Sequence, residues 1–157
     1  MNDSTFDVES FLDSAVETPF DIVRTTLPAG DDYLGQIHKI DGRIVETKAQ
    51  GDRRIIDVTW RIINKEDVIA QLNLTEAYVR QTVWLDFDVT GTKLARGVNQ
   101  NIQLGQIREA VNQNHIGAWS PRQLVGAGPA RLKISERVDE KNPALKYNDV
   151  DRVTRMS

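Results

Sequence analysis

The stretch Arg53-Arg54-Ile55-Ile56-Asp57-Val58-Thr59-Trp60-Arg61-Ile62-Ile63 decides the fold class of this chain. One set of alternate positions is apolar: Ile56, Val58, Trp60 and Ile62. The intervening set is polar: Asp57, Thr59 and Arg61. Side chains of a strand alternate between two faces, so this pattern predicts a β-strand with one face in a core and one toward solvent. We therefore expect Trp60 to be a core residue.

The same period of two recurs on both sides of this stretch. It predicts strands over Tyr33–Ile40, Arg43–Thr47, Val79–Val89, Ala130–Val138 and Tyr147–Met156. The first two are halves of one strand, broken by a turn or bulge at Asp41-Gly42. In the last strand, Val150 and Val153 are out of strict phase, which favours a bulge there.

One segment between the strands has a helical period. Apolar residues recur about every 3.6 positions through Val98–Asn114, which predicts the main α-helix. Ser120-Pro121 predicts a short helical turn that stops at Gly126. Asn64–Ala77 is compatible with a short helix or an irregular connection.

The order of these elements is strand, strand, strand, helix, strand, strand. The fold class we expect is mainly β: a five-stranded OB-fold-like barrel with one main α-helix between strands 3 and 4, behind an N-terminal arm. Other β-rich folds share this order. The domains expected are an acidic N-terminal arm and connector over residues 1–32 and an OB-fold-like domain over residues 33–157.

Charge separates these two parts of the 157-residue chain. Residues 1–32 carry eight acidic side chains and one basic one, a net −7, whereas the remaining 125 carry 15 acidic and 19 basic ones, a net +4. Thr5–Val16 has the apolar spacing of a short amphipathic helix among these acids. It is either a solvated arm or one that docks a partner or masks the protein's own surface.

Composition narrows the chemistry. The absence of cysteine excludes disulfides, thiolate zinc sites and iron–sulfur clusters, and two histidines exclude a three-histidine metal centre in one chain. Asp86 and Asp88 are spaced to seat an ion, but a solvated strand face is the favoured interpretation. We therefore expect no enzyme activity, no cofactor and no metal. No apolar run approaches the roughly 20 residues that span a bilayer, and the N-terminus is acidic, so we expect neither membrane association nor secretion.

Basic and aromatic residues are more informative. In an OB-fold, loops 1–2 and 4–5 flank a ligand groove over strands 2 and 3, and single-stranded nucleic acid needs cations for phosphates and flat rings for bases. Trp84 is either a stacking platform in that groove or packed under the arm. The predicted nucleic-acid-binding residues are Lys48, Arg53, Arg54, Tyr78, Arg80, Trp84, Arg131, Lys133, Arg137, Lys141, Lys146 and Tyr147.

Several short motifs also resemble a known group of proteins. They are Phe11-Leu12-Asp13, Leu27-Pro28-Ala29-Gly30, Ile56-Asp57-Val58-Thr59-Trp60, Val79-Arg80-Gln81, Leu85-Asp86, Asn101-Ile102-Gln103-Leu104-Gly105-Gln106-Ile107-Arg108-Glu109-Ala110 and Tyr147-Asn148-Asp149-Val150. In this order the sequence resembles bacteriophage-encoded single-stranded-DNA-binding proteins with an OB-fold, from replication and recombination gene clusters. Many replicative binding proteins end in an acidic tail, whereas this sequence has its acids at the front.

The resemblance implies a non-catalytic, sequence-tolerant single-stranded-DNA-binding protein of phage DNA replication or recombination. It implies the cytoplasm of an infected bacterial host, single-stranded DNA and replication or recombination proteins as partners, and a homo-oligomer as an open possibility. The alternative is a phage structural or protein-interaction β-barrel that docks through its N-terminal arm. A third hypothesis is an inhibitor that mimics DNA with its acidic front, against which the basic body argues.

Overall fold

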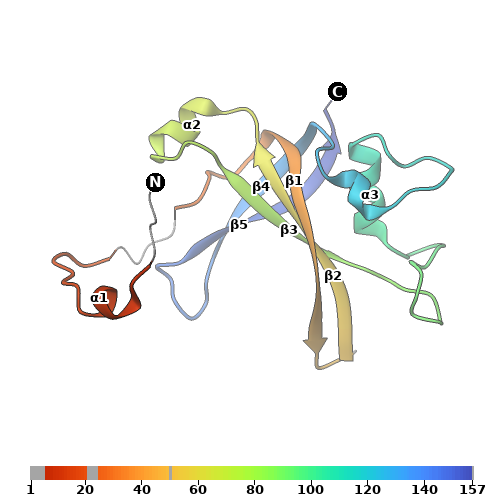
Figure 1. Cartoon of the computed structure of the whole chain (residues 1–157). Coiled ribbons are helices and arrows are strands. Elements are labelled where there is room, and N and C mark those ends of the chain that lie inside the picture. The colour runs from red at the N-terminus through yellow and green to blue at the C-terminus, as the bar shows by residue number, and fades with distance from the viewer. Residues whose placement is uncertain (1–5, 21–24, 50, 157) are drawn as a thin grey trace, which may run out of the picture.

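One antiparallel sheet organises the chain, with the strands in the spatial order β3-β2-β1-β4-β5 (Figure 1). The computed structural model describes residues 6–20, 25–49 and 51–156. The strands are β1 (Gly30–Thr47), β2 (Gly51–Ile62), β3 (Tyr78–Trp84), β4 (Ala130–Val138) and β5 (Lys146–Arg155). The predicted mainly β class with five strands is therefore confirmed.

The helices are short. They are α1 (Val8–Leu12), α2 (Glu66–Gln71), α3 (Ile102–Ala110) and the 3-10 helix η1 (Pro121–Leu124). The turn predicted at Ser120-Pro121 is confirmed as η1, whose first residue is the proline. No helix in the described ranges is long and apolar enough to cross a membrane.

The break predicted at Asp41-Gly42 is wrong, because β1 runs through it. Gly42 pairs with Ile56 inside a continuous ladder with β2. The irregularity lies instead between Ile37 and Lys39. Continuous pairing with a long partner strand outweighs the local turn preference of the Asp-Gly pair.

Two predicted boundaries extend too far. β3 ends at Trp84 and not at Val89: the chain turns back so that Phe87 bridges to Leu94. The Asp88 carboxylate accepts hydrogen bonds from Thr90 and the Thr92 N–H, which stabilises this turn.

Helix α3 is also shorter than the predicted Val98–Asn114. Asn101, before its first residue, and Asn112, just beyond its end, have φ of 51° and 60°, in the left-handed region that interrupts an α-helix. The helical apolar spacing begins at Val98, before Asn101, and runs to Val111, next to Asn112, so spacing alone predicted a longer helix.

The core lies between the inner face of the sheet and α3. Trp60, Val58 and Val83 are fully buried, as is Ile107 of α3, which lies against the sheet. Trp60 is therefore a core residue, as its phase predicted, and its Nε1–H donates to Gln81 Oε1 at 2.9 Å.

The bulge predicted in the last strand is confirmed. Lys133 pairs with Arg152 and the next residue, Ile134, pairs with Val150, so Asp151 is the extra residue. The extra residue changes the phase of the strand, which accounts for the spacing of Val150 and Val153.

The sheet curls so that its two edge strands approach. Residues of β3 and β5 have Cα atoms within 8 Å of one another. No hydrogen-bonded ladder joins these strands in the described residues, and β3 and β5 end the sheet. The structure therefore shows an open five-stranded sheet, not the closed barrel that the sequence predicted.

Residues 6–20 of the N-terminal arm lie away from the sheet (Figure 1). Helix α1 has no buried residue, and Phe6, Phe11 and Leu12 are exposed. The chain joins the body at Leu27, which is buried and exchanges backbone hydrogen bonds with the side chain of Asn148. The predicted arm helix over Thr5–Val16 is thus reduced to five residues, and residue 5 lies outside the described ranges.

Candidate functional site

The outer faces of β2 and β3 form a polar surface. Cross-strand pairs bring Thr59 opposite Arg80, and Arg61 opposite Tyr78. Because side chains alternate along a strand, these residues lie on the face of the sheet that points away from the core. The face predicted to carry Tyr78, Arg80 and Trp84 is therefore formed.

Two adjoining cavities hollow this surface. One, of about 400 Å³, extends from β3 to Arg137 and Tyr147 at the other edge of the sheet. The other, of about 530 Å³, extends from β3 to β1. They share Thr59, Tyr78 and Arg80, so we treat them as one feature and call it the groove.

Four of the predicted residues line the groove: Tyr78, Arg80, Arg137 and Tyr147. The Arg137 guanidinium lies 5.0 Å from the centre of the Tyr147 ring, and its Nε donates to Asp149 Oδ2 at 3.0 Å. That hydrogen bond raises the pKa of Arg137. A stacked guanidinium and ring therefore form one wall of the groove.

The part of the groove toward β1 contains a pair of rings. His38 and Tyr78 have ring centres 5.0 Å apart. The Tyr78 hydroxyl donates to the Glu76 carboxylate, which raises the pKa of Tyr78. His38 reaches this position at the irregularity in β1, so its role in the groove was not predictable from strand phase.

A buried carboxylate lies beneath the groove. Asp57 is 3% exposed and accepts hydrogen bonds from Arg43 Nε at 2.6 Å, Arg43 Nη2 at 3.3 Å and Thr82 Oγ1 at 3.0 Å. These hydrogen bonds, that of Arg43 above all, lower the pKa of Asp57 despite its burial. The sequence analysis assigned no role to Arg43 or Asp57. A signal was present, since Asp57 is an acid flanked directly by two apolar residues, Ile56 and Val58.

Trp84 and Arg53 form a separate cluster at the end of β3. Arg53 lies 5.3 Å from the centre of the Trp84 ring and 3.7 Å from Asp86 Oδ1. Trp84 is 38% exposed. It does not line the groove, and α1 of the arm has no buried residue.

Two arginines predicted to lie in the first loop lie in β2 instead. The loop is shorter than expected, since β2 begins at Gly51 and contains both Arg53 and Arg54. Arg54 lies 4.4 Å from the centre of the Phe87 ring and donates to the Gly91 carbonyl. Arg53, through Asp86, and Arg54, through Phe87 and Gly91, therefore both contact the segment that follows β3.

The remaining predicted cations are dispersed. Arg131 donates to the Asp31 carbonyl at 2.8 Å, next to the start of β1, and Lys133 is exposed on β4. Lys48 lies in the β1–β2 turn, and Lys141 and Lys146 lie in and beside the β4–β5 turn. None of these five lines the groove.

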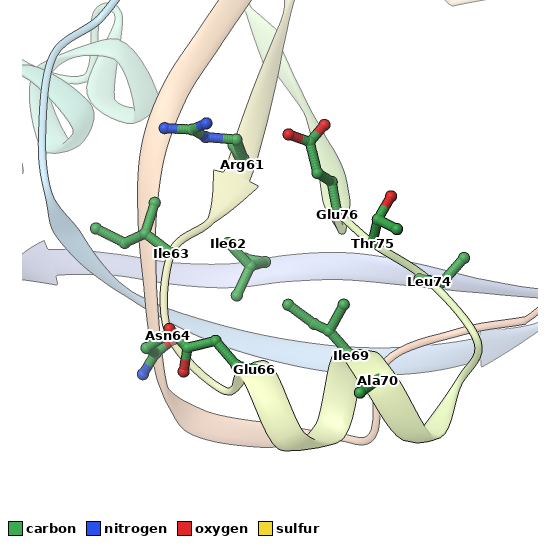
Figure 2. Close-up of a pocket in the computed structure, with 10 residues that line it drawn as sticks. All are labelled: Arg61, Ile62, Ile63, Asn64, Glu66, Ile69, Ala70, Leu74, Thr75 and Glu76. Atoms are coloured by element: carbon green, nitrogen blue, oxygen red, sulfur yellow. The ribbon is translucent and has the colours of Figure 1, made fainter.

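A third cavity, of about 430 Å³, lies where β2 ends and α2 follows. Figure 2 shows Ile62 and Ile69 within it, and Arg61 and Glu76 on its side toward the sheet. Arg61 is also the cross-strand partner of Tyr78, so this cavity lies next to the groove. The sequence analysis did not predict it.

Asp86 and Asp88 do not act as a pair. Asp86 accepts from the Asn101 N–H at 2.8 Å, whereas Asp88 stabilises the following turn. No group of three or more His, Asp or Glu side chains able to hold a metal occurs in the part of the chain that the structure describes.

The fold and the groove define a class: a mainly β protein with an open, curled antiparallel sheet and a groove lined by aromatic rings and by side chains of both charges. The charged residues of the groove are Lys39, Arg80, Arg137, Asp41, Asp57 and Asp149. Comparison with protein-family models gives no match. No curated protein and no solved structure matches the chain either.

Proposed function

We propose that this protein binds single-stranded DNA in the groove, without sequence specificity and without catalysis. The observation that carries the proposal is that Tyr78, Arg80, Arg137 and Tyr147, which come from three strands and two distant parts of the sequence, line one cavity.

The chemistry of these side chains suits an unpaired strand. Guanidinium groups bind phosphates, and a tyrosine ring stacks on any base, at about 1–3 kcal/mol per base by alanine substitution. The bases of a duplex are stacked on each other and paired. We therefore expect duplex DNA to bind more weakly.

The position of the groove also supports the finer fold assignment. We propose that the sheet is an OB-fold-like barrel, incompletely closed between β3 and β5. In OB-folds, the face of strands 2 and 3 binds oligonucleotides together with the loops between strands 1–2 and 4–5. The groove lies on β2 and β3 and reaches Arg137 and Tyr147, which flank the β4–β5 turn.

The biological setting follows from the sequence resemblance. We propose a role in phage DNA replication or recombination in the cytoplasm of an infected bacterium, with replication or recombination proteins as further partners.

Fluorescence anisotropy with labelled oligo-dT at two salt concentrations tests the binding function. Affinity should fall by about 0.7 log units per log unit of salt for each phosphate neutralised. The double variant Arg80→Ala/Arg137→Ala should bind at least about tenfold more weakly than the wild type.

Lys133→Ala/Arg152→Ala is the matched control. It removes the same charge from neighbouring positions of β4 and β5, outside the groove. Absent binding, binding independent of salt, or equal losses in the two double variants would contradict the proposal.

The exposed arm favours a second candidate function, docking to a protein. Phe6, Val8, Phe11 and Leu12 are each at least half exposed, which is unusual for apolar side chains gathered on one short helix. Deletion of residues 1–20 separates the two functions. Loss of a defined oligomer in light scattering, with no oligo-dT binding in the intact chain, would establish docking in place of DNA binding.

A further inference from the structure

A basic cavity lies beside α3, away from the groove. It has a volume of about 680 Å³, and its walls come from α3 and from the segments 93–101 and 114–119 on either side of that helix. We call it the α3 cavity. It shares no lining residue with the groove.

The charge of the α3 cavity has one sign. Lys93, Arg96 and Arg108 line it, and no described lining residue carries a carboxylate. Lys93 and Arg96 are exposed, and neither forms an ion pair with a side chain in the described ranges. Convergent cations without an internal counter-charge favour an anionic ligand.

Arg108 is held rigidly in the wall. Its guanidinium lies 4.1 Å from the centre of the Trp119 ring. Its Nε and Nη2 donate to the Gln113 carbonyl at 3.2 and 2.9 Å, and the Gln113 side chain accepts from Trp119 Nε1 at 2.9 Å. Because Arg108 and Trp119 are both hydrogen-bonded to Gln113, their stack is preorganised before a ligand binds.

Glycine occupies a wall position where the fold does not require it. Gly105 lies in the middle of α3, its φ is not positive, and a Cβ there would meet no heavy atom within 4 Å. Glycine in a helix interior costs about 1 kcal/mol relative to alanine. The open backbone at this position permits the close approach of a ligand.

We propose that the α3 cavity binds a nucleotide unit. The phosphate lies against Lys93 and Arg96, and the base lies against the Arg108 guanidinium, which lines the cavity and is already stacked on Trp119, since arginine planes stack on bases. The volume is within the range of small-ligand sites. The unit comes either from a free nucleotide or from a nucleic-acid strand, and the proposal stands independently of the groove.

Titrations of the full-length ¹⁵N-labelled protein with ADP, inorganic phosphate and a 12-residue oligo-dT test this site. The readout is the amide signals of Gly97, Gly105 and Gly117, which line the cavity. We expect ADP or oligo-dT to shift these signals, and Lys93→Ala/Arg96→Ala to weaken that binding by at least about tenfold. Lys133→Ala/Lys141→Ala should leave it unchanged, since neither lysine lines the α3 cavity.

The arms of the experiment distinguish the sources. Shifts with ADP identify a free-nucleotide site, and shifts with oligo-dT alone identify a site for a strand. Arg108→Lys keeps the charge but loses the planar stack, so it should weaken ADP more than inorganic phosphate.

Three results would overturn the proposal. One is that no probe shifts the three glycine signals. Another is that the two double variants weaken binding equally. The third is that inorganic phosphate binds as tightly as ADP and oligo-dT, since the site would then recognise a phosphate and not a nucleotide. Failure of groove binding in the anisotropy assay leaves the ADP result intact, so the two proposals fail separately.

Discussion

The two faces of β2 have different roles, although their residues alternate along one strand. The inner face contributes Val58 and Trp60, which are 0% exposed, to the core. The outer face contributes Thr59 to the groove, but it also buries Ile55 and Asp57. The polar face is therefore not merely solvated: it has a buried layer of its own beneath the groove. Substitutions at neighbouring positions should therefore separate stability from binding.

The largest effect should come from the inner face. Trp60→Ala removes a fully buried side chain and its hydrogen bond to Gln81, so the free energy of unfolding should fall by about 3–5 kcal/mol. Urea denaturation measures the change. Trp60→Phe should lose less, because it retains most of the buried ring. A Trp60→Ala protein of unchanged stability would contradict the assignment of this face to the core.

The next effect should come from the buried layer of the outer face. Asp57→Asn removes the charge that Arg43 and Thr82 satisfy, and the free energy of unfolding at neutral pH should fall by about 1–3 kcal/mol. Because folding lowers the pKa of Asp57, its contribution is complete above the ordinary carboxyl pKa of about 3.9 and is lost as pH falls through the lower folded value.

The wild type and Asp57→Asn should therefore become more similar in stability at acid pH, below about pH 4. Urea midpoints at a series of pH values measure this. Thr59→Ala, on the same face of β2, is the control whose difference from the wild type should not depend on pH. A pH-independent difference for Asp57→Asn would show that the carboxylate is not engaged as described.

The smallest effect on stability should come from the exposed groove surface, where the effect on binding is large. Arg80 is exposed, and Arg80→Ala should change the free energy of unfolding by no more than about 0.5 kcal/mol. The same variant should bind oligo-dT at least about threefold more weakly, through the loss of a phosphate contact. Anisotropy and urea denaturation on one preparation compare the two. Unchanged binding would remove Arg80 from the proposed site.

Much of the sheet was predictable because burial imposes a period of two. The alternation through Arg53–Ile63 identified the inner face of β2 correctly, and the phase change between Val150 and Val153 identified the bulge in β5. Boundaries were less predictable. Asn101 and Asn112 interrupt the helix through their backbone conformation, which apolar spacing does not reveal.

The groove was predictable only in part. Strand phase placed Tyr78 and Arg80 on one face, and hairpin position placed Tyr147 near the opposite wall. The same reasoning predicted groove positions for Lys48 and Lys133, but both residues lie outside the groove. Charge alone does not say where a turn or a sheet edge points. The pairing of Arg43 with Asp57 depends on the register between β1 and β2.

By itself, the sequence determined the mainly β class, the inner face of β2 and the separation of an acidic arm from a basic body, because alternation and charge are local properties. Only the tertiary structure decided that the sheet stays open and that Tyr78 lines one cavity with Arg137 and Tyr147. It also decided that cations from α3 and from the segment before it line one cavity. The physical reason is that register, curl and loop path follow from packing between segments distant in sequence, and no local pattern records them.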